Sequence, residues 1–133
     1  MKKILIIEDE TAYQKILRDA FEKEGFEVTV ATDVKQGTSE VAKKRPDMIL
    51  LDIMLPGGMN GFDFLERLKA NESTKSIPVI IITNLSSEDK VAKEIGASFY
   101  FVKSDVGIGQ IVNKVKEFLV ETPLVTDKKG VIL

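Results

Sequence analysis

Short apolar runs and longer amphipathic stretches alternate along the chain. The runs have the length of buried strands and are bounded by charged or turn-forming residues. In the stretches between them, apolar residues recur at helical spacing. Repeated strand–helix units of this kind are typical of an α/β fold built on a parallel sheet. We therefore predict five such units, with strands at 4–7, 26–31, 48–51, 78–82 and 99–102.

The first three predicted helices differ in the strength of their apolar stripe. The first carries apolar residues from Tyr13 to Phe21 and should stop at Gly25, because glycine readily ends a helix. Asp33 is the expected N-cap of the second helix, whose apolar stripe is thin. The third helix should place three apolar residues against the sheet, namely Phe62, Leu65 and Leu68.

The last two predicted helices have recognisable start signals. The fourth is expected at 86–95, where the hydroxyls of Ser86 and Ser87 can cap its first turn. The fifth should start after Ser104 or Asp105 as its cap, and it has the strongest apolar stripe of the chain.

Length and composition limit the number of domains and the classes of partner. A chain of 133 residues is most simply one domain, which we expect at residues 1–120, with 121–133 as a tail or truncated linker. Hydrophobic residues make up 44% and charged residues 30%, as in ordinary globular proteins. The formal net charge of −2 argues against a general electrostatic affinity for nucleic acid. The apolar run at 4–7 is too short for a signal peptide or a membrane span, so we expect a cytoplasmic protein.

The chain contains no cysteine and no histidine. Disulfides, thiolate metal sites and cysteine nucleophiles are therefore excluded, as are serine–histidine triads and histidine-ligated zinc. Any reaction must rely on carboxylates, lysine, hydroxyl groups or a bound ion.

Functional groups stand at the ends of four predicted strands. Glu8 and Asp9 follow the first strand, Asp52 the third, Thr83 the fourth and Lys103 the fifth. The carboxyl ends of parallel strands share one edge of the sheet, where ligands of open α/β sheets bind. Neighbouring carboxylates repel each other unless a cation shares their site, and oxygen ligands suit a hard divalent ion such as Mg²⁺. The sequence thus predicts an acidic cation site at this edge.

This arrangement resembles the receiver domains of response regulators, and the resemblance covers residues 2–120. It implies a flavodoxin-like, doubly wound five-stranded parallel sheet of order 2-1-3-4-5 with five helices. It also implies that Asp52 accepts a phosphoryl group. Asp9 and Asp52 would bind Mg²⁺ directly, Glu8 would do so mainly through water, and the backbone carbonyl of Met54 would complete the protein ligands. Lys103 would contact a phosphoryl oxygen.

The resemblance further implies a conformational switch. Thr83 would donate its hydroxyl to the phosphoryl group, and Tyr100 would move inward with it, which changes the surface formed by the fourth helix, fifth strand and fifth helix. The expected partners are a sensor histidine kinase or phosphotransfer protein and a downstream protein target, with homodimerisation as an option. The chain would be a phosphoacceptor signalling domain rather than an enzyme, and it would not bind nucleic acid directly.

Several residues depart from the usual receiver pattern. Ser104 follows Lys103 where most receivers have proline, and Asn84 stands where a very small residue is usual. The loop 55–61 has one more residue than the commonest form. Met54 and Leu85 occupy positions that tune the lifetime of the phosphoryl group in this family. Because neither can orient an attacking water by hydrogen bonding, we predict slow self-dephosphorylation.

Each site residue also has an ordinary structural explanation. Glu8 and Asp9 would be favourable at the N-terminus of a helix, and Asp52 could simply be solvated at a strand end. Lys103 could lie along apolar surface with its ammonium group in water. The combination at successive strand ends is far more specific than any single residue.

Three other functions fit parts of this pattern. An aspartate-nucleophile phosphatase usually has a second acid two residues after the nucleophile, where this chain has Met54. A nucleotide- or flavin-binding domain would need an anion-binding loop after the first strand, but Glu8 and Asp9 would repel phosphate there. A receiver-shaped interaction domain that signals without phosphorylation is the main alternative, because Asn84 and Ser104 depart from the pattern.

Overall fold

The computed structural model describes residues 1–56, 60–119 and 128–129. Strands and helices alternate along the chain, as the apolar pattern predicts. The strands are β1 (Lys3–Ile7), β2 (Glu27–Ala31), β3 (Met48–Leu51), β4 (Val79–Thr83) and β5 (Phe99–Val102). The helices are α1 (Thr11–Lys23), α2 (Val34–Lys43), α3 (Gly61–Ala70), α4 (Asp89–Ile95) and α5 (Ile108–Leu119), with a 3₁₀ turn η1 (Lys103–Asp105).

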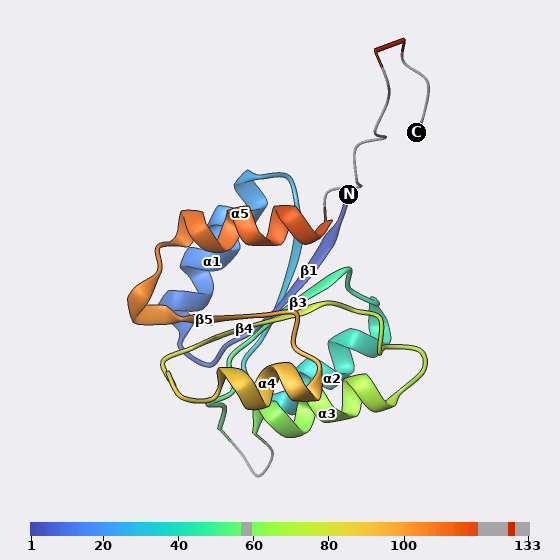
Figure 1. The fold of residues 1–133 in the computed structure, drawn as a ribbon, viewed down its shortest axis with the longest axis vertical. Helices are drawn as coiled ribbons and strands as arrows, with labels where there is room; N and C mark the ends of the chain where they lie inside the picture. Colours follow the sequence, from blue (N-terminus) through green and yellow to red (C-terminus); the bar gives the residue numbers. More distant parts are fainter. Residues whose placement is uncertain (57–59, 120–127, 130–133) are drawn as a thin grey trace.

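The strands form one parallel sheet in the order β2-β1-β3-β4-β5 (Figure 1). Its central strands β1, β3 and β4 are almost wholly apolar, because both of their faces are covered. In the register of the sheet, Ile7 is paired with Ala31 on one side and with Leu51 on the other. The carboxyl ends of these strands therefore lie level with one another. The expected fold class and strand order are confirmed.

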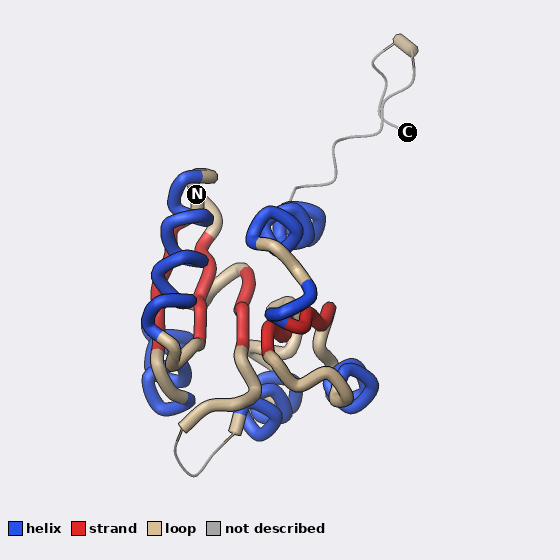
Figure 2. Tube along the Cα trace, turned by 90° about the vertical axis from the view of Figure 1, so that its left-hand side faces the viewer, coloured by secondary structure: helices blue, strands red, loops and turns tan. Residues whose placement is uncertain are grey.

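Helices cover both faces of the sheet, with α1 and α5 on one face and α2, α3 and α4 on the other (Figure 1). Figure 2 shows the same layers with strands in red and helices in blue. Two apolar clusters result. On one face, strand residues pack against α1 and α5 through Leu17, Phe21, Ile111 and Val115. On the other face, a different set of strand residues packs against α2, α3 and α4. None of the described helices is long and apolar enough to cross a bilayer.

The signals predicted for the first two helices agree with the structure. α1 ends at Lys23, and Gly25 then adopts a φ of 92°, a conformation that glycine reaches without steric cost. The side chain of Asp33 caps α2 by accepting a hydrogen bond of 2.7 Å from the Gln36 N–H. In α3, Phe64 is buried together with the predicted Leu65 and Leu68.

The predicted starts of the last two helices are wrong. α4 begins only at Asp89, without a side-chain cap, because the backbone at Leu85 is held in a loop by hydrogen bonds to Thr83 and Tyr100. Neither Ser104 nor Asp105 caps α5. Those residues form η1, and α5 starts later, where the Gln110 side chain accepts a hydrogen bond of 2.9 Å from the Gly107 N–H.

Two of the expectations concern residues that the structure leaves undescribed. The proposed extra residue in the loop 55–61 falls partly on 57–59, and the tail or linker at 121–133 falls almost wholly on 121–127 and 130–133. Those expectations lie outside the described residues.

Candidate functional site at the carboxyl edge of the sheet

Backbone hydrogen bonds extend the sheet by one residue beyond the ends of β1 and β3. The Glu8 N–H donates to the carbonyl of Ala31 at 2.9 Å, and the Asp52 N–H donates to the carbonyl of Ile7 at 3.0 Å. Glu8 and Asp52 are thereby fixed on neighbouring strands at the same level. The sheet itself places the two acidic side chains together.

Three carboxylates gather at this edge. Glu8, Asp9 and Asp52 each offer an oxygen, and these oxygens all lie within 4.8 Å of one another. Glu8 is only 2% exposed and Asp52 only 6% exposed, whereas Asp9 is exposed to solvent. Hard oxygen donors at this spacing suit Mg²⁺ or a similar ion, because a divalent cation offsets the repulsion among the acids. The donor set therefore fits the cation site that the sequence predicts.

Lys103 lies between two of these acids. Its Nζ donates to Asp52 Oδ2 at 2.9 Å and also donates to Glu8 Oε1. The side chain of Lys103 is only 9% exposed, so the ammonium group is nearly removed from water. Burial lowers the pKa of Lys103, but the hydrogen bonds and charges of Glu8 and Asp52 outweigh burial, and the net shift is upward. Lys103 therefore stays positively charged in the site.

Burial raises the pKa of Glu8, the carboxylate partner of Lys103. The pKa of Glu8 rises from 4.5 to about 7, because burial and the negative charge of Asp52 together outweigh the hydrogen bond from Lys103, which lowers it. Glu8 is thus poised to exchange a proton near neutral pH in the absence of a divalent ion.

The two oxygens of Asp52 have different partners. Oδ2 accepts from Lys103, and Oδ1 accepts from the backbone N–H of Met54 at 2.9 Å. These bonds hold the carboxylate in one orientation. It faces an open hollow of about 380 Å³, whose walls are formed by Asp9, Glu10, Asp52, Met54, Asn84 and Lys103. A carboxylate fixed toward an open hollow is accessible to a small reactant.

Thr83 and Tyr100, the predicted switch residues, are connected through Leu85. Thr83 is fully buried at the end of β4, and its Oγ1 accepts a hydrogen bond of 3.5 Å from the Leu85 N–H. The Tyr100 hydroxyl donates to the carbonyl of Leu85. Thr83 is not among the residues that form the walls of the hollow, although the next residue, Asn84, is. The backbone of Leu85 therefore links the end of β4 to β5.

Two residues near the site were missed by the sequence reasoning. The ring of Tyr13 lies under Lys103 Nζ, 4.7 Å from the ring centroid. Gln14 Nε2 donates to the carbonyl of Glu8 at 2.9 Å and to that of Ala31 at 3.3 Å, which ties α1 to the ends of β1 and β2. Both residues lie on a helix with an ordinary amphipathic pattern, so no sequence signal distinguishes them from surface or core residues.

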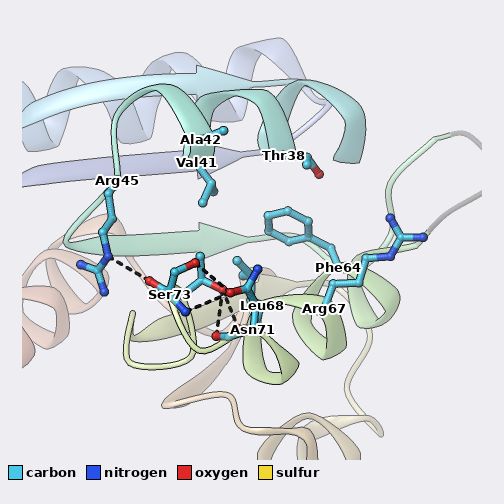
Figure 3. A pocket seen from close by; sticks show the side chains of 10 residues that line it. Thr38, Val41, Ala42, Arg45, Phe64, Arg67, Leu68, Asn71 and Ser73 are labelled. Atoms are coloured by element: carbon cyan, nitrogen blue, oxygen red, sulfur yellow. Dashed lines mark hydrogen bonds between the residues drawn. The ribbon is translucent and has the colours of Figure 1, made fainter.

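A second hollow, of about 400 Å³, lies away from the carboxylates between α2 and α3 (Figure 3). Its walls include the apolar Phe64 and Leu68, and Arg45 and Arg67 lie at opposite ends of the view. It shares no wall residue with the hollow at Asp52. The chemistry-bearing groups are at the carboxyl edge, so we assign the candidate site there.

Comparison with known proteins gives the family. Residues 4–116 match the response regulator receiver domain. The chain is 37% identical over 120 residues to sporulation initiation phosphotransferase F of Bacillus subtilis, which covers 89% of this chain and 94% of that protein. It is 38% identical over 104 residues to the phosphate regulon transcriptional regulatory protein PhoB of Pseudomonas aeruginosa, covering 77% of this chain and 45% of that protein. The chain thus spans about half the length of the transcriptional regulators that it matches.

Solved structures agree with this assignment. A response regulator receiver domain protein from Methanospirillum hungatei is 32% identical, with a TM-score of 0.78, and the match covers 88% of this chain and 92% of that one. The Mn²⁺-bound form of response regulator Rcp1 is 26% identical, with a TM-score of 0.79 and coverage of 96% and 100%. Receiver domains are signalling domains rather than classical enzymes. Since the match extends over most of the chain and the strand order is that of a receiver, this chain belongs to the response regulator receiver domain family of two-component systems.

Proposed function

We propose that this domain accepts a phosphoryl group on Asp52 in a Mg²⁺-dependent reaction and thereby switches a protein-binding surface. The observation that carries the proposal is the position of Lys103, whose ammonium group lies between Asp52 and Glu8 within a cluster of three carboxylates. A buried cation at an acidic cluster can neutralise an incoming phosphoryl group, whereas the carboxylates alone would repel it.

Glu8, Asp9 and Asp52 are the residues that would hold Mg²⁺, together with the backbone carbonyl of Met54. When bound, the ion would supply positive charge to the oxygens of the transferring group. The Mn²⁺-bound form of Rcp1 supports a divalent ion in a domain of this fold. The fold keeps the buried carboxylates of Glu8 and Asp52 next to each other, an arrangement that destabilises the protein unless a positive charge lies between them.

Asp52 would act as the nucleophile. One of its carboxylate oxygens attacks the phosphorus, a P–O bond to Asp52 forms, and the bond between phosphorus and the donor breaks. With a phosphohistidine donor, the imidazole leaves and takes up a proton. The hydrogen bond from the Met54 N–H fixes the direction of the carboxylate, so little reorientation is needed before attack.

Lys103 would supply the second positive charge. It stays charged because Glu8 and Asp52 raise its pKa despite burial. Its short-range contact with Asp52 places it within reach of an oxygen on any group attached there. A lysine acts at such a site as a compact point charge with donors that can turn to a new partner.

The switch would run through Leu85. If the Thr83 hydroxyl turns toward a phosphoryl oxygen, its weak contact with the Leu85 N–H changes, and the same residue holds the Tyr100 hydroxyl. Tyr100 lies on β5, an edge strand flanked by α4 and α5 (Figure 1), so the change reaches the molecular surface. We propose that this α4–β5–α5 face binds a downstream protein, and that two copies can also associate through it.

The domain itself has no histidine, so its donor would be a sensor histidine kinase, a phosphotransfer protein or a small phosphodonor in the cytoplasm. We place the receiver at residues 1–120 and propose that it signals through protein contact, without inserting into a membrane or binding nucleic acid itself.

Intact mass after incubation with acetyl phosphate tests the proposal. The protein should gain one phosphoryl group, about 80 Da, only when Mg²⁺ is present. Asp52→Asn should abolish the gain. Asp19→Asn is the matched control, because Asp19 is an exposed carboxylate on α1 that pairs with Lys15 and is not part of the acidic cluster or the walls of the hollow. Amide exchange on the same samples should change at α4, β5 and α5.

A gain that survives in Asp52→Asn would disprove the assignment of the phosphoacceptor. No gain in a folded wild-type protein would favour the alternative, an interaction domain that works without phosphorylation. Exchange that changes elsewhere, but not at α4, β5 or α5, would refute the proposed switch face.

A further inference from the structure

Tyr13 on α1 has an unusual environment beside the site. Its ring lies under the ammonium group of Lys103, with Nζ 4.7 Å from the ring centroid. Among the described residues, its hydroxyl is the one buried side-chain polar atom without a hydrogen-bond partner. The rest of the ring packs with the apolar cluster under α1 and α5. The position of Tyr13 is therefore explained by what its ring contacts rather than by its hydroxyl.

Few groups hold the ammonium group of Lys103 in place. Its hydrogen bonds go to Glu8 and Asp52, and both acids belong to the cluster that would bind a divalent ion. An ion and a phosphoryl group would therefore draw on the same carboxylates that now hold the ammonium group. The ring of Tyr13 is the neutral partner, because an aromatic face attracts a cation without being a ligand for a hard metal ion.

We propose that Tyr13 is a positioning residue that holds the Lys103 ammonium group beside Asp52 through a cation–π contact. The proposal rests on the function proposed above, to which it adds a residue on α1. A carboxylate in place of the ring would also hold Lys103, but it would repel the phosphoryl group. Aliphatic side chains would fill the space without attracting the ammonium group. An aromatic ring meets both requirements.

The hydroxyl of Tyr13 has no part in this role. A space of about 10 Å³ is bounded by Tyr13, Glu8, Asp52 and apolar residues of α1 and the strands. A space of that size holds at most a single water molecule. Removing an unpaired buried hydroxyl costs little, whereas removing the ring removes the cation–π contact. Tyr13→Phe and Tyr13→Leu therefore separate the two parts of the side chain.

A double-mutant cycle with acetyl phosphate and Mg²⁺ tests the proposal. Tyr13→Leu should slow phosphorylation about tenfold, which corresponds to about 1.4 kcal/mol, while Tyr13→Phe should stay within about twofold of wild type. In a Lys103→Met background, Tyr13→Leu should cause no additional loss, because the ring then has no cation to hold. Ile16→Ala is the matched control, since Ile16 is exposed one turn later on α1 and should leave the rate unchanged.

Three results would overturn the proposal. The first is an equal loss from Tyr13→Leu with and without Lys103, which would indicate a general packing role. The second is a loss in Tyr13→Phe as large as in Tyr13→Leu, which would assign the effect to the hydroxyl. The third is a Tyr13→Leu rate equal to wild type. If the wild-type protein takes up no phosphoryl group, the proposed function fails, and the same cycle read by urea unfolding decides whether Tyr13 and Lys103 are coupled.

Discussion

Replacing Glu8 by glutamine should change how the stability of the protein depends on pH. Glu8 is 2% exposed, and burial raises its pKa to about 7 in the folded protein, from 4.5 in the unfolded chain. Between these values the folded protein holds a proton at Glu8 that the unfolded chain has lost. Stability from this proton is complete below the unfolded pKa and is lost as the pH rises through the folded pKa. Glutamine has no such proton.

The magnitude follows from the difference between the two pKa values. A rise from 4.5 to about 7, at about 1.4 kcal/mol per pH unit, corresponds to on the order of 3 kcal/mol. Without divalent ions, Glu8→Gln should therefore become more stable relative to wild type by up to about that amount as the pH rises from about 4.5 to about 8. The comparison between the two proteins cancels the other titrating groups.

Urea unfolding followed by circular dichroism in EDTA is a suitable assay. Wild type and Glu8→Gln would be measured at about pH 5 and about pH 8, on either side of the raised pKa. Glu66→Gln provides the control, because Glu66 is an exposed carboxylate on α3. Adding Mg²⁺ at about pH 8 should stabilise wild type more than Glu8→Gln, since the ion replaces the lost proton as counter-charge.

Parallel pH dependence in wild type and Glu8→Gln would refute this reasoning. It would mean that Glu8 titrates in the folded protein as it does in the unfolded chain, and that Lys103 alone compensates its charge. A Mg²⁺ effect of equal size in the two proteins would remove Glu8 from the cation site while leaving Asp9 and Asp52 in place.

Changes at Gly61 and Met54, which both follow β3 in the chain, should affect the stability of the protein and the lifetime of the phosphoryl group. Gly61→Ala should destabilise the protein by roughly 1–3 kcal/mol in urea unfolding, because a Cβ there would lie 2.5 Å from Ile53 Cα and 2.7 Å from the Asp52 carbonyl oxygen. Gly109→Ala in α5 is the control, because a Cβ there meets nothing within 4 Å. We expect it to raise the free energy of unfolding by up to about 1 kcal/mol. Equal effects of Gly61→Ala and Gly109→Ala on stability would contradict this account. Met54 is exposed at the wall of the hollow, and its side chain cannot orient a water molecule by hydrogen bonding. Met54→Asn should therefore shorten the half-life of the phosphorylated protein about tenfold, as measured by intact mass. An unchanged half-life would mean that Met54 does not shield the phosphoryl group from water.

Most of the fold follows from the pattern of apolar and polar residues along the chain. Strands buried on both faces must be continuous apolar runs, and such runs are visible at 48–51 and 78–82 without any knowledge of their neighbours. The carboxyl edge of a parallel sheet collects the residues that follow its strands, so Glu8, Asp52 and Lys103 could be assigned to one edge before their contacts were known.

Helix starts were less predictable, because local capping signals compete with tertiary contacts. Ser86 can cap a helix, yet the backbone just before it is tied to Thr83 and Tyr100, and α4 starts later. Asp105 can cap a helix, but it lies in the 3₁₀ turn η1, whose first residue, Lys103, extends its side chain into the acidic cluster. In both places a contact between distant residues overrides a local preference.

Which groups touch within the site, and how they titrate, depends on the packed structure and is not encoded in any local pattern. Lys103 and Glu8 are 95 residues apart in the chain, and their contact depends on the sheet order that brings both to the same edge. The raised pKa of Glu8 arises from burial, which no residue type encodes. Tyr13 has an ordinary place in an amphipathic helix, and it is the packing of α1 against the sheet that puts its ring under Lys103. Local sequence patterns determine where helices and strands form. Interactions between charged side chains depend on distances that exist only after the helices and strands have packed.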